Sequence, residues 1–264
     1  MSRATASDVR PLPRAVAIAL SVLSGVGVFC AFPDWDMHYL AWFALVPLLI
    51  AGDGQRVRDG FWLGLIAGTV TNFGGFHWIT SMLMEFGHLP APIAWALLLL
   101  QAITQGFAMA LGLALWRWLV RLGAPRALSA MLSLWAGEVM VPMIFPWFMG
   151  NGIAHEITMI QIADLGGVAL VSAMLYASNA ALAELIAGLR RGALPQLRFV
   201  SATAVCVALA FGYGIWRVPM VDDDANAAAK LKIGLVEGDV GIWEKEAKHL
   251  EPVARVQTLR KNLL

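Results

Sequence analysis

Few side chains in this sequence have the type and spacing that catalysis needs. The two cysteines, Cys30 and Cys206, lie inside separate apolar runs without the spacing of a metal or redox site. The five histidines are scattered, and no glycine-rich phosphate loop is followed by a lysine. No serine or cysteine nucleophile has a plausible base. We therefore expect no catalytic residue, no metal site and no cofactor within this chain.

Four membrane-associated residues are candidates for a lipid or substrate cradle. Glu138 lies near the middle of an apolar run, where a carboxylate costs roughly 2.5 kcal/mol or more. It either serves function or is a neutral, hydrogen-bonded side chain that joins two helices. Trp78, Pro146 and Trp147 lie toward the outer side of their runs. Single tryptophans there usually form the interfacial belt, but together these residues line the side where we expect a lipid-facing site.

The composition indicates that lipid is the solvent for most of the chain. Of its 264 residues, 59% are hydrophobic and 14% are charged, and the mean hydropathy is +0.69. Soluble domains average about 45–50% apolar and about 25% charged residues. The net charge of +1 gives no reason to expect a nucleic-acid partner. All five lysines lie within the last 35 residues, which predicts a soluble tail after about Met220.

The apolar runs predict an all-α polytopic membrane bundle of about seven transmembrane helices. A spanning helix needs about 20 apolar residues. The first two runs are short and joined by a turn with Pro33, so a partly re-entrant hairpin remains an alternative to two full crossings. The expected spans cover residues 15–31, 39–52, 60–84, 91–118, 127–149, 157–188 and 199–218.

The arginines predict the orientation. Eleven of them fall in the N-terminal tail and in alternate loops, whereas the opposite loops 32–38, 85–90 and 150–156 contain no lysine or arginine. Since basic loops stay on the cytoplasmic side, we expect a cytoplasmic N-terminus. Seven crossings then place residues after Met220 outside the cytoplasm.

Small and polar residues predict how the helices pack. Gly60, Gly64 and Gly68 share one helix face, which lets another backbone approach closely and gives Asn72 a protein partner. Gln101, Thr104 and Gln105 are expected to share the same buried polar layer.

The chain is expected to divide into four parts. These are a cytoplasmic tail (1–14), a transmembrane helical domain (15–218), a polar linker (219–230) and the beginning of a further domain (231–264). Residues 231–236 read as a strand, and residues 252–264 as a helix start. One strand and one helix cannot bury a core of their own, so we expect the tail to open a larger domain.

Several collinear segments resemble apolipoprotein N-acyltransferases. They are Phe32-Pro33, Leu40–Leu49, Gly60–Gly64, His77–Ile79, Phe86–Pro90, Trp135 with Glu138, Phe145–Trp147, Gln161–Val168 with Asn179, and Ile233–Val240. The last of these is similar to the first strand of the family's α/β nitrilase-like (carbon-nitrogen hydrolase) domain. The resemblance covers essentially the whole chain.

The resemblance implies an acyltransferase of lipoprotein biosynthesis in the bacterial inner membrane. Such an enzyme moves an acyl chain from a phospholipid donor to the diacylglyceryl-cysteine of a diacylated lipoprotein acceptor. It uses a Glu–Lys–Cys triad in the periplasmic nitrilase-like domain. The resemblance places that triad beyond Leu264, so this chain alone is expected to be inactive.

Some positions depart from the family pattern. Val141 stands where the family usually has arginine, Glu237 stands where it has glutamine, and Lys245, the fifth cradle candidate, is followed by Glu246 instead of tryptophan. We therefore expect the chain to be a fragment, half of a split enzyme that works with a separate nitrilase-like chain, or a degenerate relative. The alternative function is a non-enzymatic small transporter or scaffold, suggested by the polar residues at mid-membrane.

Overall fold

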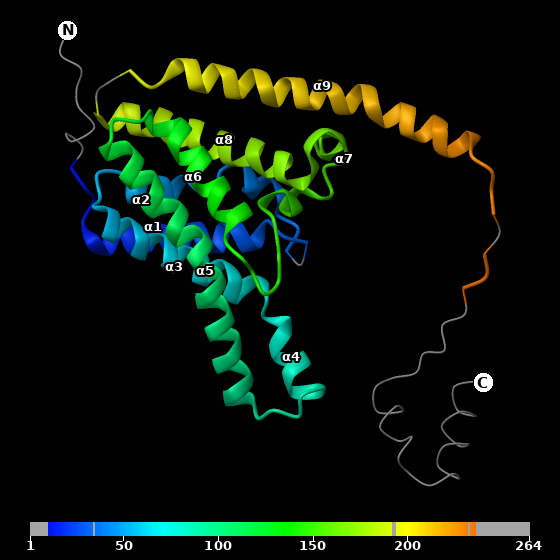
Figure 1. Cartoon of the computed structure of the whole chain (residues 1–264), viewed down its shortest axis with the longest axis horizontal. Helices are drawn as coiled ribbons and strands as arrows, with labels where there is room; N and C mark the ends of the chain where they lie inside the picture. Colours follow the sequence, from blue (N-terminus) through cyan, green and yellow to red (C-terminus); the bar gives the residue numbers. More distant parts are fainter. Residues whose placement is uncertain (1–9, 34, 192–193, 232, 236–264) are drawn as a thin grey trace.

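The computed structural model describes residues 10–33, 35–191, 194–231 and 233–235. All regular structure in these ranges is helical, as the all-α expectation requires (Figure 1). The elements are α1 (Arg14–Cys30), η1 (His38–Trp42), α2 (Val46–Gly52), α3 (Val57–Gly75), α4 (Trp78–Glu85), α5 (Ala91–Arg121), α6 (Arg126–Met140), η2 (Met149–Ile153), α7 (Ile157–Ile160), α8 (Ala163–Arg191) and α9 (Leu197–Ala227). The two η elements are short 3-10 helices.

Three helices, α5, α8 and α9, are long and apolar enough to cross a membrane. Large apolar side chains are also exposed around the molecule; Leu100 is 58% exposed, Leu209 67% and Ile215 69%. Because a soluble surface rarely carries so much exposed apolar area, these faces contact lipid, and the chain is a membrane protein. The other four predicted spans correspond to shorter or interrupted helices, so the count of seven crossings stays a prediction.

Glycine and proline interrupt the expected spans. The predicted span 60–84 divides because α3 ends at the weak helix formers Gly74 and Gly75. In the predicted span 127–149, α6 ends at Met140 because the next residue, Val141, precedes a proline and is extended. At both interruptions, backbone N–H and C=O groups lose their helical hydrogen-bond partners, so other segments must provide partners for them.

The last two predicted spans also have different bounds. In the run 157–188, α7 is a separate single turn, and α8 is kinked where Gly167 adopts φ 65° and ψ −172°. Glycine is the residue that tolerates this conformation. The final helix, α9, continues through Pro219 to Ala227 and so includes most of the predicted linker 219–230. The aspartates at 222–224 lower the hydropathy of this segment, but the segment contains no glycine that would end the helix.

The predicted strand 231–236 is not present among its described residues, 231 and 233–235. The expected helix start at 252–264 and the candidate Lys245 lie outside the described residues.

The glycine row of α3 packs against α5, as predicted. A β-carbon on Gly64 would lie 2.5 Å from the Met109 carbonyl oxygen, and one on Gly68 would lie 2.7 Å from the Gly106 Cα. The two backbones are therefore too close for any side chain at these positions. This approach brings Asn72, at the end of the glycine row, beside Gln105.

The segment from η1 to α2 is a short irregular insertion rather than a long helix. With 7 residues, α2 rises only about 10 Å. The backbone N–H of Leu45 donates to Asn179 Oδ1 at 2.8 Å, and Asn179 Nδ2 donates to the Ala41 carbonyl oxygen at 2.8 Å. Ser24 accepts from the Leu48 N–H at 3.1 Å. Irregular backbone at membrane depth is tolerated where protein groups satisfy it, so these contacts favour the re-entrant alternative for this segment.

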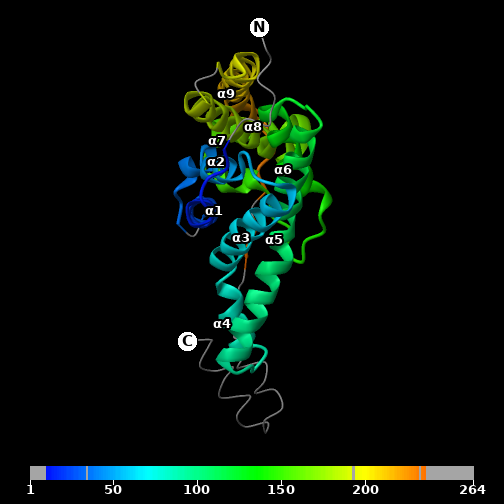
Figure 2. The same ribbon diagram turned by 90° about the vertical axis from the view of Figure 1, so that its left-hand side faces the viewer.

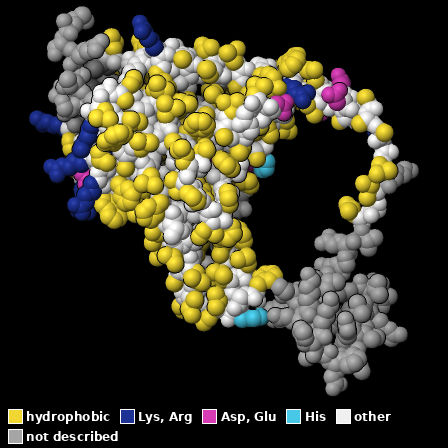
Figure 3. All heavy atoms as spheres, viewed as in Figure 1, with side chains coloured by type: hydrophobic (Ala, Val, Ile, Leu, Met, Phe, Trp, Pro, Cys, Tyr) yellow, Lys and Arg dark blue, Asp and Glu magenta, His cyan; other side chains and the backbone are white. Residues whose placement is uncertain are grey.

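The helices form a bundle with one projecting arm. In Figure 1, α9 lies along α8 on one side of α1, α2 and α3, and Figure 2 shows α4 and the adjacent end of α5 projecting away from them. The basic side chains gather mainly at the end of the bundle where α1 begins (Figure 3). The opposite ends of α1 and α3 carry the cavity described next.

Candidate functional site

A cavity of about 300 Å³ lies between the last turns of α1 and α3 and the irregular segment that follows α6. We call it the aromatic cavity. Its lining contains no charged side chain. The lining residues are Phe29, Phe32, Pro33, Thr71, Asn72, Gly75, Phe76, Pro146, Trp147 and Asn151.

A chain of amide hydrogen bonds fixes the floor of the aromatic cavity. Gln105 Nε2 and Trp147 Nε1 both donate to Asn72 Oδ1, at 2.8 and 3.0 Å. Gln105 Oε1 in turn accepts from the Phe145 N–H at 2.8 Å. Asn72 and Gln105 are buried, so each of these bonds replaces one that water would otherwise make. The polar residues of α3 and α5 thereby position the Phe145–Trp147 segment.

Aromatic rings form the walls. The Trp147 ring meets Phe32 edge-to-face with centroids 5.2 Å apart, and Phe76 stacks on Phe145 at 5.7 Å. Trp78, from the first turn of α4, approaches Phe145 at 6.2 Å. Ring pairs at these separations hold their geometry while presenting apolar surface. The cavity is therefore suited to an apolar ligand or to the apolar part of an amphipathic one.

Glu138 holds the other end of the same irregular segment. Its Oε2 accepts from the Met149 N–H at 2.6 Å and from the Tyr176 hydroxyl at 3.0 Å. The Ser172 hydroxyl accepts from the Gly150 N–H at 2.9 Å. Since Glu138 is 7% exposed and lies outside the aromatic cavity lining, its visible contacts join α6, η2 and α8 rather than face a ligand.

A hydrogen-bonded contact, which we call the loop clasp, joins two loops beside the cavity. Asp36 Oδ1 lies 2.8 Å from His155 Nδ1 and 3.6 Å from His38 Nδ1. The hydrogen bond with His155 is the main cause that lowers the pKa of Asp36 below its ordinary value. Asp36 adopts a positive φ of 49°, so the loop is held in a conformation that few residues other than glycine, asparagine and aspartate adopt. The clasp connects the 32–38 loop to the 149–156 segment.

The predicted cradle residues divide into three groups. Pro146 and Trp147 line the aromatic cavity, and Trp78 lies next to it through Phe145. Glu138 supports the segment from behind. Lys245 lies outside the described residues.

Several other residues of the site were not predicted from the sequence. Phe29, Phe76 and Asn151 line the cavity, and Tyr176 and Ser172 support Glu138 and its neighbours, but none of them was singled out. Pairing across distant helices carries no local sequence signal. The described residues contain no group of three or more His, Cys, Asp or Glu that could hold a metal ion.

Comparison with known proteins gives one consistent family. A family model described as the apolipoprotein N-acyltransferase N-terminal domain matches residues 24–181. The chain is 29% identical over 231 residues to the apolipoprotein N-acyltransferase of Geobacter metallireducens, covering 84% of this chain and 43% of that protein. It is 31% identical over 234 residues to the one of Azotobacter vinelandii, again covering 84% and 43%. It is 28% identical over 236 residues to the one of Bdellovibrio bacteriovorus, covering 85% and 42%. The chain thus spans less than half the length of these relatives.

Proposed function

Because the chain belongs to the apolipoprotein N-acyltransferase family, we propose that it forms the membrane part of an enzyme that acylates lipoproteins. In this proposal an acyl chain moves from a phospholipid to the N-terminal diacylglyceryl-cysteine of a lipoprotein. The aromatic cavity is the observation that supports a role for this part of the enzyme. In this proposal the cavity binds the acyl chain that is to be transferred.

The lining of the cavity supports this role. Phe29, Phe76 and Trp147 supply apolar surface, and the lining has no charged group that a hydrocarbon chain would have to desolvate. The volume of about 300 Å³ is at the lower end of the range for ligand pockets, which suits one segment of an acyl chain. The polar groups of Asn72 and Gln105 are already satisfied by protein partners, so an apolar ligand leaves them paired.

The chemistry requires a nucleophile outside the described residues. A thiolate attacks the ester carbonyl of the phospholipid and forms a thioester, and the lysophospholipid alkoxide takes up a proton as it is expelled. The α-amine of the acceptor then attacks the thioester, loses one proton, forms an amide and releases the thiolate. We propose that residues 231–264 begin the nitrilase-like domain that supplies this thiolate, or that a separate nitrilase-like chain does so.

The distribution of arginines supports the accompanying topology. We propose a cytoplasmic N-terminus, residues 15–218 as the membrane domain, and a periplasmic position for the residues that follow it in the bacterial inner membrane. The aromatic cavity then lies toward the periplasmic side, at the ends of α1 and α3 remote from the basic side chains. The phospholipid donor would come from that leaflet.

An acyl-transfer assay tests the proposal. The purified chain, in detergent with phospholipid, is mixed with a diacylated lipopeptide, with and without the nitrilase-like domain of a family relative. We expect no transfer by the chain alone and transfer when the domain is added. Transfer by the chain alone would contradict the assignment of the nucleophile. Failure of every added nitrilase-like domain, with both parts folded, would contradict the proposed function.

A further inference from the structure

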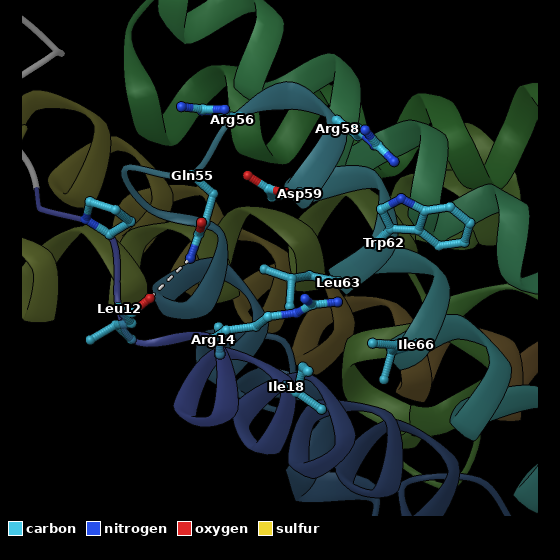
Figure 4. Close-up of a pocket in the computed structure, with 12 residues that line it drawn as sticks. Leu12, Arg14, Ile18, Gln55, Arg56, Arg58, Asp59, Trp62, Leu63 and Ile66 are labelled. Carbon is cyan, nitrogen blue, oxygen red and sulfur yellow. Dashed lines mark hydrogen bonds between the residues drawn. The ribbon is translucent and has the colours of Figure 1, made fainter.

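A second cavity, of about 460 Å³, lies at the opposite ends of α1 and α3. We call it the arginine pocket. Its walls come from the residues before α1, the first turns of α1, the loop before α3 and the first half of α3 (Figure 4). At its rim, Gln55 Nε2 donates to the Leu12 carbonyl oxygen at 3.4 Å and ties the two walls together.

Three guanidinium groups give the arginine pocket its charge. Arg14, Arg56 and Arg58 line it and are exposed, and Asp59 is the one acidic residue of the lining. No ion pair joins any of the three arginines to a carboxylate within the part of the chain that the structure describes. The lining therefore carries a net charge of +2, from three arginines and one aspartate.

Neighbouring arginines at the same end behave differently. Arg117 and Arg126 both pair with Asp53, and Arg117 is only 3% exposed. These two cations are used inside the protein, where they hold the ends of α5 and α6 to the loop before α3. Among the described residues, the guanidinium groups of the arginine pocket have no such carboxylate partner, so we treat them as groups that a ligand can reach.

The rest of the lining is apolar and continues along the helices. Figure 4 shows Arg14 and Ile18 on α1 below Leu63 of α3, with Ile66 farther along α3 and Trp62 above it. The Trp62 side chain is 50% exposed, as is usual for tryptophans at the boundary between headgroups and hydrocarbon. A ligand that fills the pocket must offer an anionic group to the arginines and apolar surface to the residues below.

We propose that the arginine pocket binds the headgroup of an anionic phospholipid. Figure 4 shows the Arg56 and Arg58 side chains directed away from each other and the Arg14 side chain extending beneath Leu63, so the three guanidinium groups surround the pocket instead of meeting at one point. Each attracts the anionic headgroup and can donate to a phosphate oxygen, for which its planar donor geometry is well matched. The acyl chains leave the pocket along Ile18, Trp62 and Ile66. The proposal does not depend on acyl transfer, because the pocket is separate from the aromatic cavity.

The pocket favours a lipid over a free phosphate for two reasons. About half of its wall is apolar, and it lies at the end of membrane-embedded helices, where lipid headgroups are concentrated. It favours an anionic lipid over a zwitterionic one because only Asp59 is available to pair with a headgroup amine.

The test compares lipid binding by the full chain and by charge variants. The chain is held in nanodiscs of phosphatidylcholine, phosphatidylglycerol is titrated in, and bound lipid is counted by native mass spectrometry. We expect Arg56→Gln with Arg58→Gln to weaken phosphatidylglycerol binding about 25-fold, since each arginine contributes about fivefold near a surface. Arg14→Gln, on the other helix, should weaken it about fivefold.

The matched control removes two exposed arginines at the same end of the bundle, Arg190→Gln with Arg198→Gln, which are outside the pocket. It should bind phosphatidylglycerol like the unaltered chain, and melting temperatures without added lipid check that all variants are folded. Equal loss in the control would overturn the proposal, as would equal affinity for phosphatidylcholine. Displacement of the lipid by soluble glycerol phosphate at comparable concentration would reassign the pocket to a free phosphate and also overturn it.

Discussion

The two ends of the α1–α3 pair present opposite chemistry. At one end, Phe29 and Asn72 belong to a cavity whose lining has no charge and whose amides are satisfied by protein partners. At the other end, Arg14 and Arg58 belong to a pocket whose guanidinium groups have no carboxylate partner among the described residues. The same two helices thus offer a surface for hydrocarbon at one side of the bundle and a surface for phosphate at the other.

The difference shows how burial separates structural from ligand-facing polar groups. Asn72, Gln105 and Glu138 are buried, and each contacts another element of the fold. The arginines of the pocket are exposed, and none of them forms an ion pair with a carboxylate of the described residues. Substitutions at the first kind of residue should change stability, and substitutions at the second kind should change lipid binding.

The largest effect is expected at Glu138. Glu138→Ala leaves the Met149 N–H and the Tyr176 hydroxyl without their acceptor, which should lower the free energy of unfolding by about 3 kcal/mol. Thermal melts in detergent measure this loss. Trp147→Ala is the comparison and should lose less. A melting temperature for Glu138→Ala equal to that of the unaltered chain would refute its role in joining α6, η2 and α8.

A smaller loss is expected where α3 meets α5. Gly64→Ala places a β-carbon 2.5 Å from the Met109 carbonyl oxygen, which forces the helices apart at about 2 kcal/mol. Gly212→Ala in α9 is the matched control, because nothing lies within 4 Å of its added carbon. That variant should be neutral or more stable by up to about 1 kcal/mol. Equal melting temperatures for the two variants would argue against the close α3–α5 packing.

A conservative change at the aromatic cavity should have a moderate effect. Trp147→Phe keeps an aromatic ring but removes the bond from Nε1 to Asn72 Oδ1, which should lower the free energy of unfolding by about 1 kcal/mol. Trp216→Phe, at an exposed position of α9, should change it by less than about 0.5 kcal/mol. Phosphatidylglycerol binding at the arginine pocket should be the same in both. A change there would show that the two ends are not independent.

The smallest effect concerns the loop clasp beside the aromatic cavity. Because the hydrogen bond with His155 lowers the pKa of Asp36, the clasp stabilises the fold above the ordinary aspartate pKa of about 4. That contribution disappears as the pH falls through the lowered pKa. Asp36→Asn should therefore melt slightly earlier than the unaltered chain at pH 7, and the two should converge once the pH has fallen below the lowered pKa of Asp36. A difference that persists or grows at low pH would contradict this assignment.

Packing within the membrane was predictable from the sequence where a residue pattern repeats. The spacing of Gly60, Gly64 and Gly68 predicted a close helix approach, and the glycines do face α5. The polar pair Asn72 and Gln105 was expected in one buried layer and does form a hydrogen bond. Thr104, expected in the same layer, is instead exposed, and its hydroxyl donates to the Gln101 carbonyl oxygen. Such patterns are local, so they can be recognised in the sequence without knowledge of the fold.

The parts that the sequence did not predict depend on breaks and distant partners. Hydropathy alone gave continuous spans over residues 60–84 and 157–188, whereas Gly75 and Gly167 interrupt them. The last span was predicted to end at residue 218, whereas α9 ends at Ala227, because the hydropathy of the sequence falls while the chain is still helical. The partners of Glu138 come from residues 149 and 176, and no spacing rule connects these positions.

The most direct test of the central claim is to locate an acyl chain on the protein. The chain is reconstituted with a phospholipid that carries a diazirine near the end of one acyl chain, irradiated and mapped by mass spectrometry. We predict that labelling concentrates on residues 145–151 and on the ends of α1 and α3 around Phe29 and Phe76. Labelling spread over the exposed face of α9, with no excess at these residues, would contradict the aromatic cavity as the acyl-chain site.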